Sequence, residues 1–381
     1  MLVLFAITQG KMMIPDKLNF ARIGACLISF CLLSLSLSVE ADTIRQYRLE
    51  KQTNGYRLAL TTAPVPEISA DQILVKVHAA SLNRRDIYVI QGWYPGPPVT
   101  GKVPLSDGAG EVIAVGNNVT RFNVGDRVSG TFFTDWKGGK FNRSALASAR
   151  GGAVDGMLSE MIVATENDLV NIPAHLSYEE AATLPCAGVT AWNGLFKAGN
   201  LQQDDYVLLE GTGGVSTFGL LFSAAAGAKP IITSSKDNKL EKARGMGAIG
   251  TANYRKNSEW GDEVREITGG RGVDHVLEVG GERTLPQAVK ALADGGHIAI
   301  IGGLSGFGAS LRTTDLLGRS ASATGIYVGS REDHLAMNAL IEKHKIRPLI
   351  DKVFSFDDAQ AAYDYMKNGN FMGKIVIRMD Q

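Results

Sequence analysis

The sequence contains few cysteines and few prolines. Only three of its 381 residues are cysteine, namely Cys26, Cys31 and Cys186. Three cysteines cannot form a framework of several disulfides, and they cannot fill a four-cysteine zinc site. Proline is also sparse at 12 residues, whereas glycine reaches 44. Many glycines with few prolines favour tight turns between strands and helices rather than a flexible linker protein.

The sequence also lacks an excess of charge of either sign. Lysine plus arginine and aspartate plus glutamate each number 39, so the formal charge is zero. This balance argues against bulk nucleic-acid binding, which needs a broad basic face. The six histidines form no HExxH motif and no closely spaced ligand pair, which argues against a dedicated metal site. The 45% apolar content is typical of a globular protein.

One long apolar run lies near the N-terminus. Residues 23–39 carry no charge, three basic residues precede them, and Val39-Glu40-Ala41 follows. This layout is typical of a secretory signal peptide, so residues 1–42 are set apart as a signal-peptide-like leader. It predicts export to the periplasm or outside the cell. The alternatives are an uncleaved membrane anchor, for which the run is barely long enough, or a mis-assigned start codon and a cytoplasmic protein.

Two patterns divide the rest of the chain. Up to about residue 170, short apolar runs such as 73–77 and glycine-rich turns predict an antiparallel β unit. Ser177 and Glu180 then form a capping box, which predicts a helix interrupted at 184–188 and continuing to about Lys197. Beyond residue 206, strands are expected at 206–210, 230–233, 273–279 and 297–301, alternating with helices at 215–226, 237–246, 262–267 and 285–293. This alternation predicts a doubly wound α/β domain with a parallel sheet.

A glycine-rich turn joins the first of these strands to the first helix. Gly211 allows the tight turn, and Gly213 lets the backbone approach a pyrophosphate. Free amides at the helix start, from Gly214 and Val215, then face the phosphates. Ser216 replaces the usual third glycine and is still small. The turn predicts a dinucleotide site, the alternative being an ordinary glycine-rich turn.

The end of the second strand indicates which dinucleotide binds. A free ribose 2′-hydroxyl usually meets an acidic residue about twenty residues after the turn. Ser234 stands there instead, followed by Ser235, Lys236 and Lys239. Two hydroxyls and two lysines favour a 2′-phosphate, and hence NADP(H). The alternative is that the lysines belong to a solvated helix face.

Three stretches of the chain carry a family resemblance: residues 83–95 (NRRDIYVIQGWYP), residues 106–128 (beginning SDGAGEV and ending GDRV), and the Gly211 turn. Together they resemble the medium-chain dehydrogenases/reductases, in particular the zinc-free quinone oxidoreductase branch. The resemblance covers residues 43–381. It implies a GroES-like β domain at 43–172 plus 330–381, and a Rossmann NADP(H)-binding domain at 173–329. It also implies a homodimer formed through an edge strand at 321–328.

This sequence departs from the zinc-dependent members of that family. They carry cysteine where Asn83 stands and histidine where Ser106 stands, and no ligand occurs at 181–184. Cys186 is slightly displaced from the third ligand position, and the four-cysteine lobe is missing. Because a catalytic zinc needs three protein ligands, no metal site is expected.

Without a metal, a reduced nicotinamide supplies hydride and the protein supplies position and polarity. Suitable acceptors are quinones and α,β-unsaturated carbonyls, whose oxyanion products need preformed donors. Asn83 is the first candidate donor, with Tyr88, Tyr94 and Ser106 behind it. Asp86 and Asp107 are expected to hold this constellation together, or else to occupy a turn or domain interface.

The resemblance assigns further cofactor contacts. It implies that Asn83 and Thr190 alternatively touch the nicotinamide ribose and carboxamide, that Lys239 and Tyr254 lie near the adenosine phosphate, and that Gly302 approaches the cofactor.

The leading hypothesis is therefore NADPH-dependent, zinc-independent reduction of quinones or activated carbonyls. The alternatives are a metal-free NAD(P)-dependent alcohol or aldehyde dehydrogenase, and a non-catalytic NADPH-binding protein. The expected partner is a small molecule, with membrane contact only through an uncleaved leader. The leader conflicts with the intracellular location of NADPH, and an N-terminus at Asp42 would establish cleavage.

Overall fold

The computed structural model describes residues 42–97 and 99–379. The predicted leader therefore lies outside the described residues, apart from its last residue. Within the described part of the chain, no helix is both long enough and apolar enough to span a membrane.

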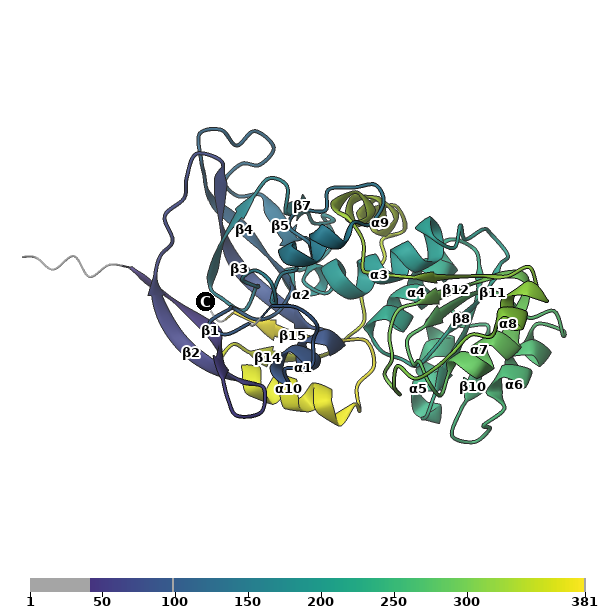
Figure 1. Ribbon diagram of the computed structural model, residues 1–381. Helices are drawn as coiled ribbons and strands as arrows, with labels where there is room; N and C mark the ends of the chain where they lie inside the picture. The colour runs from purple at the N-terminus through teal and green to yellow at the C-terminus, as the bar shows by residue number, and fades with distance from the viewer. Residues whose placement is uncertain (1–41, 98, 380–381) are drawn as a thin grey trace, which may run out of the picture. The chain divides into compact units, whose positions relative to one another are not determined.

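Strands from the first part of the chain and from its end form one mixed sheet (Figure 1). The order is β14-β15-β3-β4-β5-β7, and β6 pairs with β3. Only the β14–β15 pair is parallel among these described pairs. The strands are β3 (Gln72–Leu82), β4 (Asp107–Val115), β5 (Arg127–Gly130), β6 (Met161–Thr165), β7 (Leu169–Asn171), β14 (Ile350–Ser355) and β15 (Lys374–Arg378). A two-stranded sheet of β1 (Thr43–Lys51) and β2 (Tyr56–Pro64) precedes them.

Alternating side chains give the mixed sheet two covered faces, because successive residues of a strand point to opposite sides. On β15, Ile375 and Ile377 join the core under α1 (Arg84–Ile90) and α10 (Ala359–Asn368). Val376 joins a smaller apolar cluster with α2 (Tyr178–Ala181) on the other side. A 3₁₀ helix (Arg143–Ser148) and α9 (Arg331–His344) complete this part of the molecule.

An interrupted helix follows β7, as the capping box predicts. Ser177 Oγ accepts from the Glu180 amide at 3.2 Å, and the Ser177 amide donates to Glu180 Oε2 at 2.8 Å. Pro185 lacks an amide hydrogen, so a regular α-helix cannot run through it. The segment instead continues as a π-helix (Leu184–Gly188), α3 (Val189–Trp192) and a second π-helix (Asn193–Lys197).

The second sheet is parallel throughout, in the order β10-β9-β8-β11-β12-β13. Its strands are β8 (Tyr206–Leu209), β9 (Lys229–Ser234), β10 (Gly250–Asn253), β11 (Val273–Glu278), β12 (Leu292–Ile300) and β13 (Ser322–Gly325). Its helices are α4 (Gly214–Ala225), α5 (Asp237–Gly245), α6 (Trp260–Ile267), α7 (Leu285–Ala291) and α8 (Thr313–Leu317). Separate apolar clusters cover its two faces, so the predicted doubly wound α/β architecture is confirmed.

The strand order of this sheet reverses at its centre. The chain passes from β8 to β9 and β10 on one side, and then returns to β11 on the other side of β8. Ligands of doubly wound sheets bind at the carboxyl ends of the strands at such a switch point. The glycine-rich turn that follows β8 lies there.

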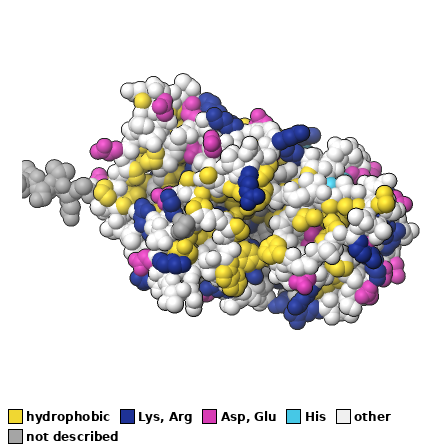
Figure 2. Space-filling view, viewed as in Figure 1, with side chains coloured by type: hydrophobic (Ala, Val, Ile, Leu, Met, Phe, Trp, Pro, Cys, Tyr) yellow, Lys and Arg dark blue, Asp and Glu magenta, His cyan; other side chains and the backbone are white. Residues whose placement is uncertain are grey.

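The face drawn in Figure 2 carries basic and acidic side chains intermingled, with apolar side chains between them. This distribution agrees with the formal charge of zero.

Candidate functional site

The glycine-rich turn has the geometry of a phosphate-binding loop. Gly211 has a φ of +71°, a conformation that favours glycine. Gly213 has a φ of −79°, which any residue can adopt, and a Cβ added there would meet nothing within 4 Å. The fold itself therefore gives no reason for glycine at position 213. The open space beside the uncapped N-terminus of α4 does give one, because a pyrophosphate needs close access to those amides.

Gly214 serves a different purpose. A Cβ at this position would lie 2.7 Å from Cδ of Lys374 and 3.1 Å from Cβ of Ala187. The Gly373 amide also donates to the Thr212 carbonyl oxygen at 2.9 Å. The start of β15 thus packs directly against the glycine turn, although the two are far apart in the sequence.

The predicted 2′-phosphate residues gather at the end of β9. Ser234 is buried, and the Tyr254 amide donates to its carbonyl oxygen at 3.2 Å. Nζ of Lys239 donates to the Phe371 carbonyl oxygen at 2.6 Å, while Nζ of Lys236 donates to the Asn370 side chain. Burial and the neighbouring Lys236 lower the pKa of Lys239. An anion bound between the two lysines would relieve this repulsion.

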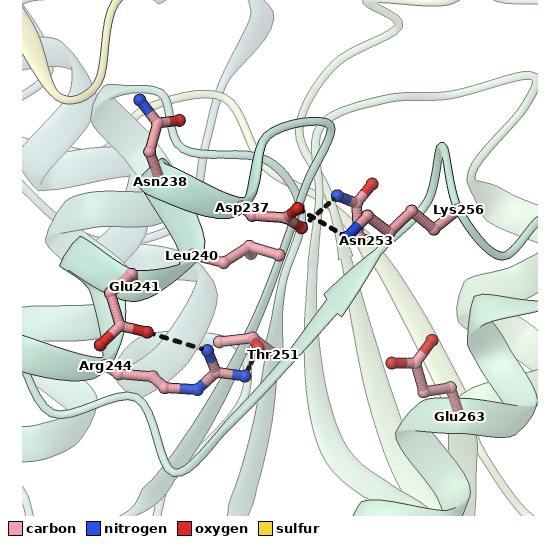
Figure 3. A pocket seen from close by; sticks show the side chains of 9 residues that line it. All are labelled: Asp237, Asn238, Leu240, Glu241, Arg244, Thr251, Asn253, Lys256 and Glu263. Atoms are coloured by element: carbon pink, nitrogen blue, oxygen red, sulfur yellow. Dashed lines mark hydrogen bonds and ion pairs between the residues drawn. The ribbon is translucent and has the colours of Figure 1, made fainter.

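A surface cavity of about 460 Å³ lies next to this segment, along the edge strand β10 (Figure 3). Asp237 accepts from Asn253 Nδ2 at 2.7 Å and pairs with Lys256 at 2.6 Å. Arg244 pairs with Glu241 at 3.3 Å. The charged groups on this side of the cavity are therefore satisfied by one another.

Lys374, Asn83 and Asp107 meet in the buried interior beside the glycine turn. Nζ of Lys374, whose residue is 3% exposed, donates to Asn83 Oδ1 at 2.5 Å and to the Leu82 carbonyl oxygen at 2.7 Å. It also lies 3.8 Å from Oδ2 of Asp107. Burial raises the pKa of Asp107, and the Lys374 cation opposes this rise.

Asp107 connects the remaining residues of this group. Its Oδ1 accepts from Ser106 Oγ at 2.6 Å, and its Oδ2 accepts from the Cys186 amide at 3.2 Å. Burial and Asp107 raise the pKa of the Cys186 thiol. Thr190 Oγ1 donates to the Cys186 carbonyl oxygen at 2.7 Å. The structure therefore places Asn83, Ser106 and Asp107 together, as the sequence predicts, with Thr190 one helical turn beyond Cys186.

One donor of Asn83 is buried without a well-formed hydrogen bond. The Asn83 oxygen accepts from Lys374, whereas its Nδ2 has no partner within the usual hydrogen-bond limits, although the Asn83 side chain helps to lower the pKa of Asp107. Leaving a buried donor unsatisfied costs about 1–3 kcal/mol, so such an atom calls for a ligand. A carbonyl oxygen of a substrate or of a carboxamide would satisfy it.

Asp86 holds the backbone at Asn83. Its Oδ2 accepts from the Asn83 amide at 2.7 Å and closes a capping box at the start of α1. Burial raises the pKa of Asp86 to about 6, although Arg85 lies 3.7 Å away. Asp86 therefore contacts the residue that it is expected to support, and its role in the reaction stays a prediction.

The two tyrosines that the sequence predicts as further donors, Tyr88 and Tyr94, contact different arginines. Tyr88 lies on α1, where Arg84 contacts its ring at 5.8 Å. The Tyr94 ring instead packs on the Arg85 guanidinium at 4.6 Å. Burial, and then the neighbouring Tyr94, raise the pKa of Tyr327 to about 12. Tyr94 therefore connects to a residue that follows β13 in the second domain.

Sequence reasoning missed Lys374, Arg85 and Tyr327 as members of this region. Lys374 gives the clearest signal, because it is a charged residue directly before the apolar run Ile375-Val376-Ile377. Trp93, the neighbour of Tyr94 in the sequence, is 70% exposed. Gly302 lies beside β11, where an added Cβ would be 3.0 Å from the Val279 carbonyl oxygen.

The residues present do not fit a catalytic zinc. The described residues contain no group of three or more histidine, cysteine, aspartate or glutamate side chains that could hold a metal ion. The Asp107 carboxylate, which lies next to Ser106 and close to Cys186, already accepts two hydrogen bonds and faces the Lys374 cation. A zinc ion needs three protein ligands with free lone pairs.

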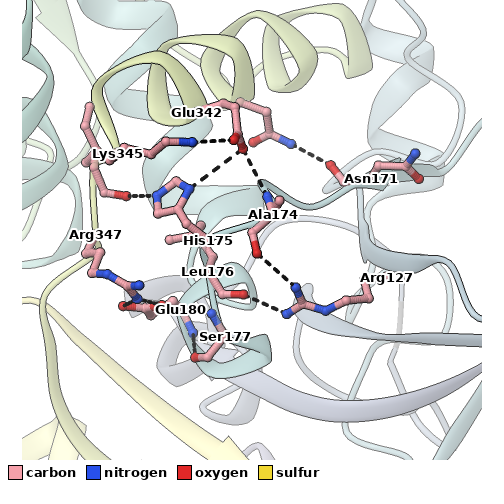
Figure 4. A network of polar contacts seen from close by, with 12 residues as sticks. Arg127, Asn171, Ala174, His175, Leu176, Ser177, Glu180, Glu342, Lys345 and Arg347 are labelled. Carbon is pink, nitrogen blue, oxygen red and sulfur yellow. Dashed lines mark hydrogen bonds and ion pairs between the residues drawn. The ribbon is translucent and has the colours of Figure 1, made fainter.

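A second polar network, away from the glycine turn, joins α9 to the segment after β7 (Figure 4). Glu342 accepts from the Ala174 amide at 3.0 Å, and His175 Nε2 contacts the Ile346 carbonyl oxygen at 2.9 Å. Arg347 bonds Glu180 at 2.7 Å. These contacts fix α9 against the interrupted helix that carries Cys186 and Thr190.

Known protein families match both parts of the chain. The alcohol dehydrogenase GroES-like domain matches residues 69–174, and the zinc-binding dehydrogenase family matches residues 214–343. A zinc-type alcohol dehydrogenase-like protein of Schizosaccharomyces pombe is 45% identical over 343 residues, covering 88% of this chain and 99% of that protein. A quinone oxidoreductase-like protein 2 homolog of Nematostella vectensis is 30% identical over 327 residues, covering 82% and 83%.

A solved structure described as an alcohol dehydrogenase of Sinorhizobium meliloti 1021 has the same architecture. It is similar with a TM-score of 0.84 and 38% identity, covering 89% of this chain and 99% of that one. The predicted pairing of a GroES-like domain with a Rossmann domain is thereby confirmed.

Proposed function

The chain belongs to the medium-chain dehydrogenase/reductase superfamily, an oxidoreductase family, and from this premise we propose that it reduces quinones or α,β-unsaturated carbonyls with NADPH and without zinc. The observation that carries this proposal is the Lys374–Asn83–Asp107 group beside the glycine turn. The quinone oxidoreductase-like relative supports the same substrate class.

The protein's contribution to the reaction is positioning and charge. A bound reduced nicotinamide supplies the hydride. Nδ2 of Asn83 donates to the acceptor's carbonyl oxygen, and Lys374 orients that amide by holding its Oδ1. As negative charge develops on the oxygen, the nearby Lys374 cation lowers its energy in a site that excludes water. Acceptors that delocalise this charge themselves need no metal.

The test is rapid-mixing oxidation of NADPH with a panel of quinones and enones, together with metal analysis of the same sample. We expect turnover that persists after chelation. Absence of turnover with every acceptor, or activity that depends on a stoichiometric metal, overturns the proposal.

A second candidate is metal-free oxidation of an alcohol. The name of the 45% identical relative, a zinc-type alcohol dehydrogenase-like protein, favours an alcohol substrate but not the absence of a metal. Reduction of NADP⁺ driven by alcohols after chelation, without quinone or enone turnover, would favour this candidate instead.

The preference for NADPH is a separate proposal, supported by Ser234, Ser235, Lys236 and Lys239 at the end of β9. The substitution Lys239→Ala should weaken NADPH binding about 10- to 100-fold, since a charge-assisted hydrogen bond contributes about 1.5–3 kcal/mol, and leave NADH binding unchanged. Lys242→Ala, an exposed residue on the same helix, is the control. Equal losses for both cofactors in a fluorescence titration would contradict a 2′-phosphate contact.

A homodimer and the domain limits are also proposed. β13 is the last strand of its sheet and is largely exposed, so a second copy can pair with its free edge. The proposed domains are 43–172 plus 330–381 and 173–329, in keeping with the return of β14 and β15 to the first sheet. Light scattering of the purified protein tests the dimer.

A further inference from the structure

Two buried glutamates face each other at the switch point of the parallel sheet. Glu210 follows β8 and Glu278 ends β11, and the preceding residues of these two neighbouring strands, Leu209 and Leu277, are paired in register. The glutamates are 2% and 0% exposed. Glu210 is also the residue directly before the glycine turn.

Backbone amides of the turn after β11 bind both carboxylates. Oε1 of Glu278 accepts from the amides of Gly280 at 2.7 Å and Gly281 at 2.6 Å, and from Thr284 Oγ1 at 2.7 Å. Oε2 of Glu210 accepts from the amides of Val279 at 3.2 Å and Gly280 at 3.3 Å. Both glutamates therefore hold the turn at 279–284 in place.

The two remaining oxygens, Oε1 of Glu210 and Oε2 of Glu278, are buried and bond no other group among the described residues. Neither carboxylate forms an ion pair with a described lysine, arginine or histidine within 4 Å. Burial, and then Glu278, raise the pKa of Glu210 well above its ordinary value. Two adjacent carboxylates without a cation cannot both be ionised in such a place.

We propose that Glu210 and Glu278 share one proton, and that this proton positions the turn at 279–284 and makes cofactor binding at the glycine turn proton-linked. The inference rests on the proposed NADPH site and adds two positioning residues to it. Loss of the proton would put two negative charges next to the turn that receives a pyrophosphate. The Ser216 hydroxyl, in the first turn of α4, donates to the Glu210 carbonyl oxygen at 2.6 Å and couples the pair to that helix.

Other charged groups near the pair are few. Glu282 and Arg283 belong to the held turn, where the Glu282 side chain lies against Gly306 and Gly308 and the Arg283 amide donates to Ser305 Oγ. Lys374 lies behind Gly214. Lys239, at the end of β9, has a lowered pKa and also loses its charge at alkaline pH, so a variant of the pair itself is needed to separate the effects.

The experiment compares NADPH affinity of the wild type and Glu210→Gln by fluorescence titration from about pH 7 to pH 10. The glutamine amide can donate permanently to Glu278. We expect similar affinity at neutral pH. Above the raised pKa of Glu210, the wild type should lose affinity by an amount that approaches tenfold per pH unit, and Glu210→Gln should show a clearly shallower loss. Equal slopes overturn the inference.

A second measurement covers the protein without cofactor. Because folding raises the pKa of Glu210, its contribution to stability is full below the ordinary pKa and is lost as pH rises through the raised one. Thermal unfolding should therefore show a stronger alkaline destabilisation in the wild type than in Glu210→Gln or Glu278→Gln. Parallel unfolding curves overturn the shared proton. If no variant binds NADPH at any pH, the proposed function fails, whereas the unfolding comparison still decides the shared proton.

Discussion

The roles of single residues in this site depend on partners that are distant in the sequence. Asn83 is predictable from its motif, but its hydrogen-bond partner Lys374 lies 291 residues away. No local pattern specifies that contact, because it depends on β15 pairing with β3 and packing against the glycine turn. The sequence therefore predicts the candidate site residues that lie in recognisable motifs, such as Asn83. It does not predict Lys374, the buried lysine that contacts them.

Lys374→Met should reduce kcat/KM for the best acceptor by about 10- to 100-fold, since a hydrogen bond from a charged group contributes about 1.5–3 kcal/mol. The Asn83 amide would lose its orientation, and Asp107 would lose its nearest cation. Steady-state kinetics with NADPH checks this expectation. Lys352→Met, an exposed lysine on the adjacent strand β14, is the matched control. Equal activity of the two variants would show that Lys374 only fills space.

At the scale of elements, most of the second domain follows from the sequence. Alternating apolar strands and capped or amphipathic helices predict β8 to α7 within a few residues, because each element buries its own apolar side. The short edge strand β10 (Gly250–Asn253) and the hairpin of β1 and β2 are not predicted. The residues of these strands show only a weak alternation of apolar and polar side chains. Their extended conformation therefore depends on the strands with which they pair. The π-helices around Cys186 likewise depend on packing.

The glycine turn offers a test at the same scale. Gly213→Ala should keep the free energy of unfolding within about 1 kcal/mol, because the new Cβ meets nothing in the fold. It should nevertheless weaken NADPH binding more than about tenfold, since the methyl group enters the space of the pyrophosphate. Gly245→Ala, at the end of α5, also meets nothing within 4 Å and is the control. Fluorescence titration and thermal unfolding provide both values, and wild-type affinity in Gly213→Ala would remove the phosphate site from this turn.

For the molecule as a whole, buried titratable groups make the free energy of unfolding depend on pH. His334 on α9 is buried, both of its ring nitrogens lack hydrogen-bond partners, and burial lowers its pKa to about 3. A histidine with a lowered folded-state pKa stabilises the protein above its ordinary pKa, and this contribution is lost as pH falls toward the lowered value. Asp86, with a raised pKa of about 6, acts in the opposite direction.

The two effects are separable by a variant that removes only the histidine. In His334→Phe, the free energy of unfolding should fall less between about pH 7 and pH 5 than in the wild type, by up to about 1.4 kcal/mol per pH unit. Denaturant unfolding at the two pH values measures the difference, and Asp86 cancels because both proteins contain it. His344→Phe changes an exposed histidine on the same helix and should leave the wild-type pH dependence intact. If His344→Phe flattens the curve as much as His334→Phe does, acid sensitivity does not originate in the buried ring, and the packing of α9 against the interrupted helix must account for it instead.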